Sequence, residues 1–92
     1  MWNVKFENKS YTVFNSFEEK MNQKIKYHLK NIRDWLNNEE ELHTDILKMH
    51  GKWVGYHRIR IGKIRIVAYI DKESKTILIK HIGYRGDIYK KG

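Results

Sequence analysis

The sequence contains no cysteine and no proline among its 92 residues. Without cysteine, neither a disulfide framework nor a thiolate metal site can form. No apolar stretch approaches the ~18 residues that a membrane-spanning helix needs, and the first residues, MWNVKFENK, lack the apolar centre of a signal peptide. We therefore expect a soluble cytoplasmic protein that does not contact a membrane.

Negative charge is also scarce. The chain has 11 acidic residues against 19 lysines and arginines, which gives a formal net charge of +8. This excess limits the partners to nucleic acid, an acidic protein or an anionic surface. Hydrophobic residues make up 40% of the chain and aromatic residues 13%, too many for a disordered segment. The length predicts a single domain over residues 1–92.

The first half of the chain predicts two helices. One apolar face repeats at intervals of three and four residues and comprises Met21, Ile25, Leu29, Ile32 and Leu36. This spacing predicts an amphipathic helix from Met21 to Leu36. Ser10 is the expected N-cap of a preceding helix that begins near Tyr11, and a break near residues 19–23 separates the two helices.

Alternation of apolar and polar residues predicts four strands, over residues 2–6, 53–61, 64–70 and 76–82. Gly62 and Lys63 form the expected tight turn of a hairpin. Residues 42–49 are expected to be a connector. The order strand, helix, helix, then three strands indicates an α+β domain, with two helices packed on one face of a small, mainly antiparallel sheet and a short C-terminal tail.

The predicted hairpin carries three arginines within WVGYHRIRIGKIRIVAY, residues 53–69. Strand alternation places Tyr56, Arg58 and Arg60 on one face, and pairing through the turn adds Arg65 to it. Arginines two residues apart stand about 6–7 Å apart, close to the spacing of phosphates along a nucleic-acid strand. Arginine binds phosphate through two parallel hydrogen bonds and keeps its proton. The alternative is a solvated face with ion pairs, but Asp71 and a few distant acids are the only carboxylates expected to neutralise it.

Other polar residues give weaker signals. Lys52 and Lys63 flank the arginine strands and add long-range attraction for anions. His57 falls on the apolar face and is expected to be a satisfied core or rim residue. His81 is a candidate for proton transfer, because an imidazole can act as a proton donor or acceptor. The five histidines show no metal-ligand spacing, and no phosphate-binding loop or nucleophile motif is present.

The string GYHRIRIGKIRIVAYID, followed by a strand and YRGDIY, resembles the RelE/ParE superfamily of toxin–antitoxin toxins. The family pattern is a tyrosine, two basic residues alternating on a strand, a turn with glycine, an arginine opening the next strand, and a basic residue followed by a terminal tyrosine. The resemblance implies a compact domain like the microbial ribonucleases. For RelE-like members it also implies cleavage of mRNA in the ribosomal A site, without a metal or cofactor.

Position by position, the resemblance carries the family's roles onto this sequence. Arg58 and Arg60 match the paired basic residues, and Arg65 matches the arginine near the scissile phosphate. Arg85 and Tyr89 match the C-terminal basic residue and tyrosine. Many relatives have lysines at the first pair, one of them a proposed base; arginine, with a pKa above ~12, is a poor base. The general base is therefore unassigned, and the tail, His81, the ribosome and the RNA itself remain candidates.

The sequence thus favours a ribosome-dependent mRNA endoribonuclease, the toxin of a type II toxin–antitoxin system. The expected catalytic residues are Arg65, Arg85 and Tyr89. The expected RNA-binding residues are Arg58, Arg60, Tyr56, Lys52 and Lys63. The expected partners are an acidic antitoxin, the ribosome with mRNA in its A site, and operator DNA reached through the antitoxin. Two alternatives remain: a non-catalytic gyrase inhibitor of the ParE type, and an RNA- or ribosome-binding domain without chemistry.

Overall fold

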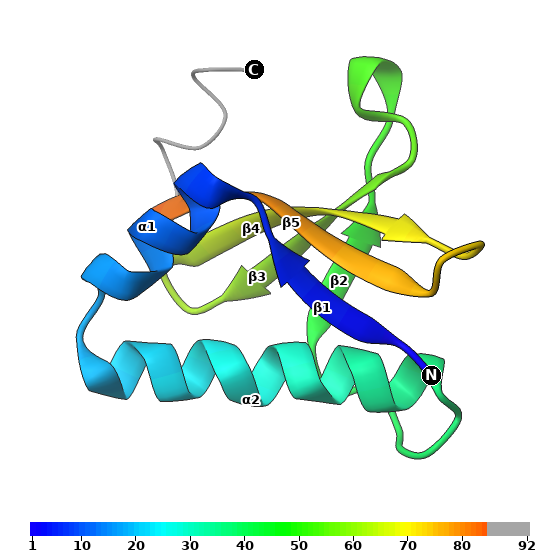
Figure 1. Ribbon diagram of the computed structural model, residues 1–92, viewed down its shortest axis with the longest axis horizontal. Coiled ribbons are helices and arrows are strands. Elements are labelled where there is room, and N and C mark those ends of the chain that lie inside the picture. The colour runs from blue at the N-terminus through cyan, green and yellow to red at the C-terminus, as the bar shows by residue number, and fades with distance from the viewer. Residues whose placement is uncertain (85–92) are drawn as a thin grey trace.

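The computed structural model describes residues 1–84, which form a five-stranded sheet and two helices (Figure 1). The elements in chain order are β1 (Asn3–Phe6), α1 (Asn8–Ser16), α2 (Glu19–Leu36), β2 (Asp45–Lys48), the 3₁₀ helix η1 (Gly51–Trp53), β3 (Tyr56–Ile61), β4 (Ile64–Asp71) and β5 (Thr76–Tyr84). The strand order is β1-β5-β4-β3-β2. β1 runs parallel to β5, and all other neighbours are antiparallel. The predicted α+β class is confirmed.

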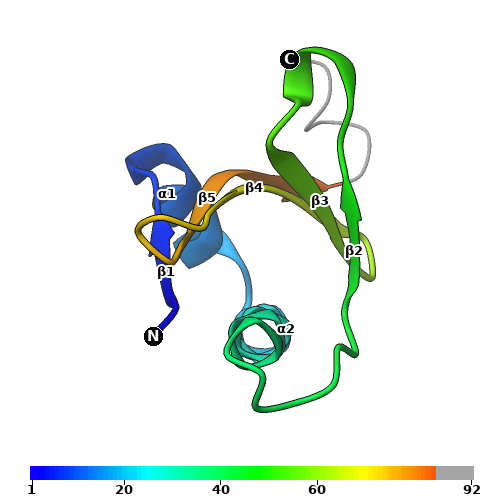
Figure 2. The same ribbon diagram turned by 90° about the vertical axis from the view of Figure 1, so that its right-hand side faces the viewer.

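The sheet curves around α2, which lies against its concave side (Figure 2). We call this side the helix face and the opposite side the outer face. The helix face is apolar because every second residue of the central strands is an aliphatic side chain. The fully buried members include Ile59, Ile66 and Ile79, and α2 contributes Ile25 and Ile32 to the same core. Burying one such side chain stabilises the fold by about 1.5–3 kcal/mol.

α1 covers the β1–β5 end of the sheet, where the rings of Phe6 and Phe14 lie 5.0 Å apart. The helix begins at Asn8, so the prediction that Ser10 caps a helix starting at Tyr11 is wrong. Ser10 is buried instead, and its hydroxyl donates a 2.6 Å hydrogen bond to the Lys80 carbonyl. The break between the helices falls at residues 17–18, just before the region in which it was expected.

The predicted connector at residues 42–49 contains a strand, β2, so that part of the prediction is wrong. Pairing with β3 creates this strand, with Ile46 opposite Ile59. The residues before it are fixed to α2 by the buried amide of Asn31, which donates to the Glu41 carbonyl at 2.9 Å and accepts from the His43 N–H at 2.7 Å. Four residues without a strong alternation do not indicate a strand until this tertiary pairing is known.

The segment between β2 and β3 rises from the sheet as an arm, which we define as residues 49–55 (Figures 1 and 2). β3 therefore begins at Tyr56, not at residue 53 as predicted, and Trp53 belongs to η1. Gly51 and Gly55 have φ angles of +67° and +94°. A residue with a side chain is strained at such angles, so the two glycines permit the bends of the arm. Within residues 1–84, neither helix is long and apolar enough to cross a membrane.

Candidate nucleic-acid interface

The outer face is organised in three rows of side chains that cross the sheet, because directly paired residues share a face. One row contains Asp45, Arg60, Arg65 and Gly83. The next contains Leu47, Arg58, Val67 and His81. The third contains Tyr56, Tyr69 and Leu78. The register confirms the prediction that the three arginines share one face with Tyr56.

Arg65 is the most enclosed of the three arginines, with 8% of its surface exposed. Its Nη1 donates to the carbonyl of Gly62 at 2.7 Å and to that of Ile64 at 3.1 Å. These bonds fix the guanidinium against the β3–β4 turn and leave its other nitrogens without a hydrogen bond inside the described chain. No carboxylate among residues 1–84 forms an ion pair with it. Backbone hydrogen bonds thus fix the position of the Arg65 guanidinium, and its remaining N–H groups are available to bind an anion.

Arg58 and Arg60 share one carboxylate, Asp45 at the start of β2. Arg60 Nε donates to Asp45 Oδ2 at 2.7 Å, and Arg58 Nη2 lies 3.6 Å from Oδ1. The argument that no acid lies close to the cluster is therefore wrong, and it failed because β2 was not predicted. One carboxylate cannot neutralise three guanidinium groups, so the rows stay positive. Arg58 Nε is buried and has no hydrogen-bond partner in the described structure.

An aromatic group lies beside the arginines. Trp53, from the arm, contacts Tyr56 at a ring-centroid distance of 5.5 Å and His81 at 5.8 Å. Tyr56 in turn contacts Tyr69 at 5.3 Å. The sequence argument placed Trp53 inside a strand and gave it no role. The glycines on either side of it, Gly51 and Gly55, were the available signal for a bent segment that brings an aromatic ring onto the outer face.

His81 joins this aromatic group to a cavity at the start of α1. The cavity has a volume of about 490 Å³ and is lined by Glu7, Asn8, Lys9, Lys80 and His81. A β-bulge near Val67 and Ala68 inserts Lys80 into β5, and bulges redirect side chains in this way. Lys80 Nζ lies 2.8 Å from Glu7 Oε1, and this hydrogen bond, followed by the interaction with Tyr56, raises the pKa of Lys80. The register places His81 in the row of Arg58, paired with Val67.

The remaining predicted residues are distributed as follows. Lys52 and Lys63 are both exposed, the first in η1 and the second in the β3–β4 turn. Neither has an ion-pair partner in the described part of the chain. Arg85 and Tyr89 lie outside the described residues, and their roles stay predictions. Residues 1–84 contain no group of three side chains that could hold a metal ion.

His57 lies on the helix face, opposite Ala68, as the alternation predicted. It is not satisfied, however, because its buried Nδ1 has no hydrogen-bond partner among the described residues. Burial lowers the pKa of His57, and the positive charges of Lys48 and Lys72 lower it further. Burial therefore favours the neutral form of the imidazole, which lies on the side of the sheet away from the arginines.

Comparisons with known proteins match this architecture in solved structures only. No protein-family model and no curated protein sequence matches the chain. A chain of the archaeal RelE–RelB complex from Pyrococcus horikoshii OT3 superposes with a TM-score of 0.72 at 20% identity, covering 94% of this chain and 97% of the other. A chain of the RelB–RelE antitoxin–toxin complex from Methanococcus jannaschii gives 0.72 at 23% identity, covering 94% and 95%. A chain of the YoeB–YefM complex from Staphylococcus aureus gives 0.70 at 25% identity, covering 92% and 98%.

These similarities extend over nearly the whole of each chain, including both helices and the sheet. The protein therefore has the fold of the RelE-like toxins of type II toxin–antitoxin systems. The fold that the arginine-strand motif implied is confirmed.

Proposed function

We propose that this protein is the toxin of a type II toxin–antitoxin system and acts as a ribosome-dependent mRNA endoribonuclease. The observation that carries the proposal is the outer face. Arg60 and Arg65 are paired directly across β3 and β4, and Arg58 lies in the adjoining row. Among residues 1–84, Asp45 forms ion pairs with Arg58 and Arg60, and no carboxylate forms one with Arg65. Fixed cations at this spacing suit successive phosphates of an RNA strand.

The reaction we propose is an internal transfer within the RNA. The ribose 2′-oxygen forms a bond to the adjacent phosphorus, the bond from phosphorus to the 5′-oxygen breaks, and the products carry a 2′,3′-cyclic phosphate and a 5′-hydroxyl. Negative charge grows on the phosphoryl oxygens as the reaction proceeds. Arg65 is positioned to stabilise it, because its guanidinium is already fixed by the Gly62 and Ile64 carbonyls. Removing one preorganised donor of this kind costs about 10²–10³ in rate in well-studied enzymes.

Proton transfer requires a different group, since an arginine stays protonated. The 2′-hydroxyl must lose a proton and the leaving 5′-oxygen must gain one. His81 is our candidate for one of these transfers, because it lies on the outer face in the row of Arg58 and an imidazole can both donate and accept a proton. Arg85 and Tyr89 remain candidates for charge stabilisation and for nucleotide contact or proton transfer, as the family resemblance implies. Arg58 and Arg60 position the RNA backbone.

We also propose a small acidic antitoxin as the partner that restrains the activity. The support comes from the charge of +8 and from the similar solved structures, which are toxins in complex with antitoxins. Operator DNA would be reached through that antitoxin. The ribosomal target places the protein in the cytoplasm.

The experiment that tests the function is the mapping of mRNA ends in a translating extract after addition of the purified protein. We expect cuts in phase with the reading frame that disappear when ribosomes are removed, and upstream fragments that end in 2′,3′-cyclic phosphate. A DNA supercoiling assay with gyrase is run in parallel. Gyrase inhibition without cuts would replace the proposal with the ParE-type alternative. Binding of ribosomes or RNA without either effect would leave a binding domain without chemistry.

A further inference from the structure

Trp53 is a large aromatic residue that does not belong to the hydrophobic core. The core cluster lies on the helix face, and Trp53 is not part of it. It lies half-buried on the other side of the sheet, in contact with Tyr56 and His81. A tryptophan that served only to stabilise the fold would gain more free energy from joining the core. Its position on the outer face therefore needs another explanation.

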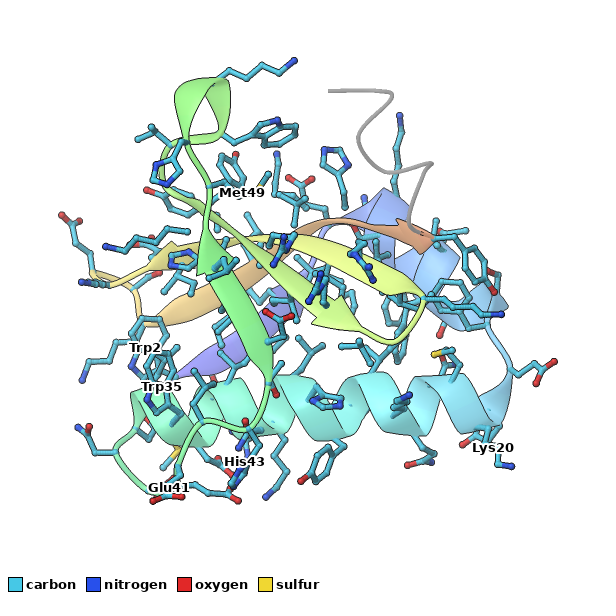
Figure 3. The ribbon with its side chains drawn as sticks, turned by 180° about the vertical axis from the view of Figure 1, so that it is seen from behind. Trp2, Lys20, Trp35, Glu41, His43 and Met49 are labelled. Atoms are coloured by element: carbon cyan, nitrogen blue, oxygen red, sulfur yellow. The ribbon has the colours of Figure 1, made fainter. Side chains whose placement is uncertain are left out.

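The arm is shaped so that it lies close to the outer face. Gly51, the first residue of η1, and Gly55, two residues after its end, both have positive φ angles. A Cβ atom built at Gly55 would lie 3.0 Å from Cε1 of Tyr69, so glycine is also required for the close approach to that ring. Met49, at the base of the arm, marks where it leaves the sheet (Figure 3). The backbone thus brings Gly55 against Tyr69, which is exposed, while Trp53 contacts Tyr56 and His81.

The rings in this group meet at steep angles. Trp53 makes interplanar angles of 88° with Tyr56 and 85° with His81, and Tyr56 makes 64° with Tyr69. Each contact brings the edge of one ring toward the face of another, and none is a parallel stack. Tyr69 is exposed and the other three side chains are partly exposed, so the group offers aromatic surface to solvent. An open aromatic face beside cations is what single-stranded nucleic acids use for stacking of their bases.

The distance from the arginines fits one nucleotide. Tyr56 precedes Arg58 by two residues on the same face, which places them about 6–7 Å apart along β3. His81 is two strand spacings away from Arg58 in the same row, or about 10 Å. A nucleotide with its phosphate at Arg58 can therefore place a neighbouring base against Trp53.

We propose that Trp53, Tyr56, Tyr69 and His81 form a stacking platform for one unpaired RNA base, next to the phosphate that the arginines hold. The platform rests on one part of the proposed function, namely that the outer face binds RNA. It does not require that the protein cleaves RNA. Stacking does not read hydrogen-bond donors and acceptors, so the platform tolerates all four bases and favours the larger purines.

The test is a binding titration with a 2′-O-methyl RNA trinucleotide, whose blocked hydroxyl cannot react. A matched trinucleotide lacks the central base but has the same phosphates. We expect the base-bearing probe to quench the fluorescence of Trp53 and to bind about tenfold more tightly than the abasic probe. In Trp53→Leu, which keeps apolar packing for the arm, both probes should bind with the weaker affinity. Trp53→Phe should retain most of the difference.

The control variant is Trp35→Leu, because Trp35 lies at the end of α2, beside Trp2 and away from the arm (Figure 3). It should leave both affinities unchanged and retain the quenching. Equal affinity of the intact protein for the two probes would overturn the platform, as would unchanged binding in Trp53→Leu or no detectable binding of the base-bearing probe. Base-dependent binding together with uncut mRNA would overturn the endoribonuclease and leave the platform standing.

Discussion

The two faces of the same three strands have opposite chemistry. On the helix face, Ile59, Ile66 and Ile79 are fully buried members of the hydrophobic core. On the outer face, the neighbouring positions hold Arg58, Arg60 and Arg65, with aromatic rings beside them. Alternation makes this division possible, since a strand offers every second residue to each side. The helix face fixes the fold, and the outer face is left available for binding.

One residue on each face departs from this division, and both departures are informative. His57 is a polar group on the helix face, and its buried Nδ1 has no hydrogen-bond partner within residues 1–84. Arg65 is an enclosed cation on the outer face, fixed by backbone carbonyls instead of a carboxylate. The first weakens the fold at acid pH. The second keeps a charge in place without neutralising it, as a phosphate site requires.

The largest effect on stability is expected for Ile66→Ala on the helix face. The change leaves a cavity in the fully buried core, and such substitutions cost about 2–5 kcal/mol. The outer-face control is Leu47→Ala, because Leu47 is 55% exposed, and it should cost less than about 0.5 kcal/mol. Urea unfolding followed by circular dichroism measures both. Equal losses would contradict the assignment of the core to one face.

A smaller effect is expected from pH through His57. The pKa of His57 is lowered from 6.5 in the folded protein, so as the pH falls the unfolded chain binds the proton before the folded chain does. The free energy of unfolding is therefore highest above pH 6.5 and decreases as the pH falls from 6.5 to the pKa of the folded state. His57→Gln removes the imidazole. The unfolding free energy of this variant should therefore fall less between pH 7.5 and 5.5 than that of the unchanged protein. Part of the slope should remain, because burial also lowers the pKa of His28. An unaltered slope would show that His57 is not held neutral.

Asp45→Asn on the outer face should change RNA affinity and leave the stability of the fold nearly unchanged. The change removes the one carboxylate that opposes Arg58 and Arg60, and the affinity for the 2′-O-methyl trinucleotide should rise about two- to fivefold at low salt. The unfolding free energy should change by less than about 1 kcal/mol, because both ion pairs are partly exposed to solvent. Weaker RNA binding would mean that Asp45 orients the arginines instead of competing with the RNA.

The smallest effect is expected for Lys63→Ala in the β3–β4 turn. Lys63 is exposed and contributes only long-range attraction, so the association rate should fall less than twofold at low salt and be unchanged at high salt. Stopped-flow mixing with the labelled trinucleotide measures this rate. A large loss that persists at high salt would place Lys63 in direct contact with the RNA.

The sequence predicted the hairpin register, the main helix and the common face of the three arginines, because each depends on local periodicity. It did not predict β2, which becomes a strand only by pairing with β3. The ion pairs of Asp45 were missed for the same reason, since they require the position of β2. Trp53 was assigned to a strand because the alternation continues through it, although Gly51 and Gly55 bend the chain on either side. The incorrect predictions all concern how segments distant in sequence pack together, and local sequence patterns do not determine this.

The most direct test of the account is the rate at which ribosome-bound mRNA is cut by Arg65→Ala and Arg65→Lys. The matched control is Lys20→Ala, which removes the same charge from the start of α2, away from the arm and near the opposite end of that helix from Trp35 (Figure 3). Circular dichroism confirms that each variant is folded. We predict at least a tenfold loss for Arg65→Ala, a partial loss for Arg65→Lys, and no change for Lys20→Ala. Unchanged cleavage by a folded Arg65→Ala variant would contradict the role of the outer face in the reaction.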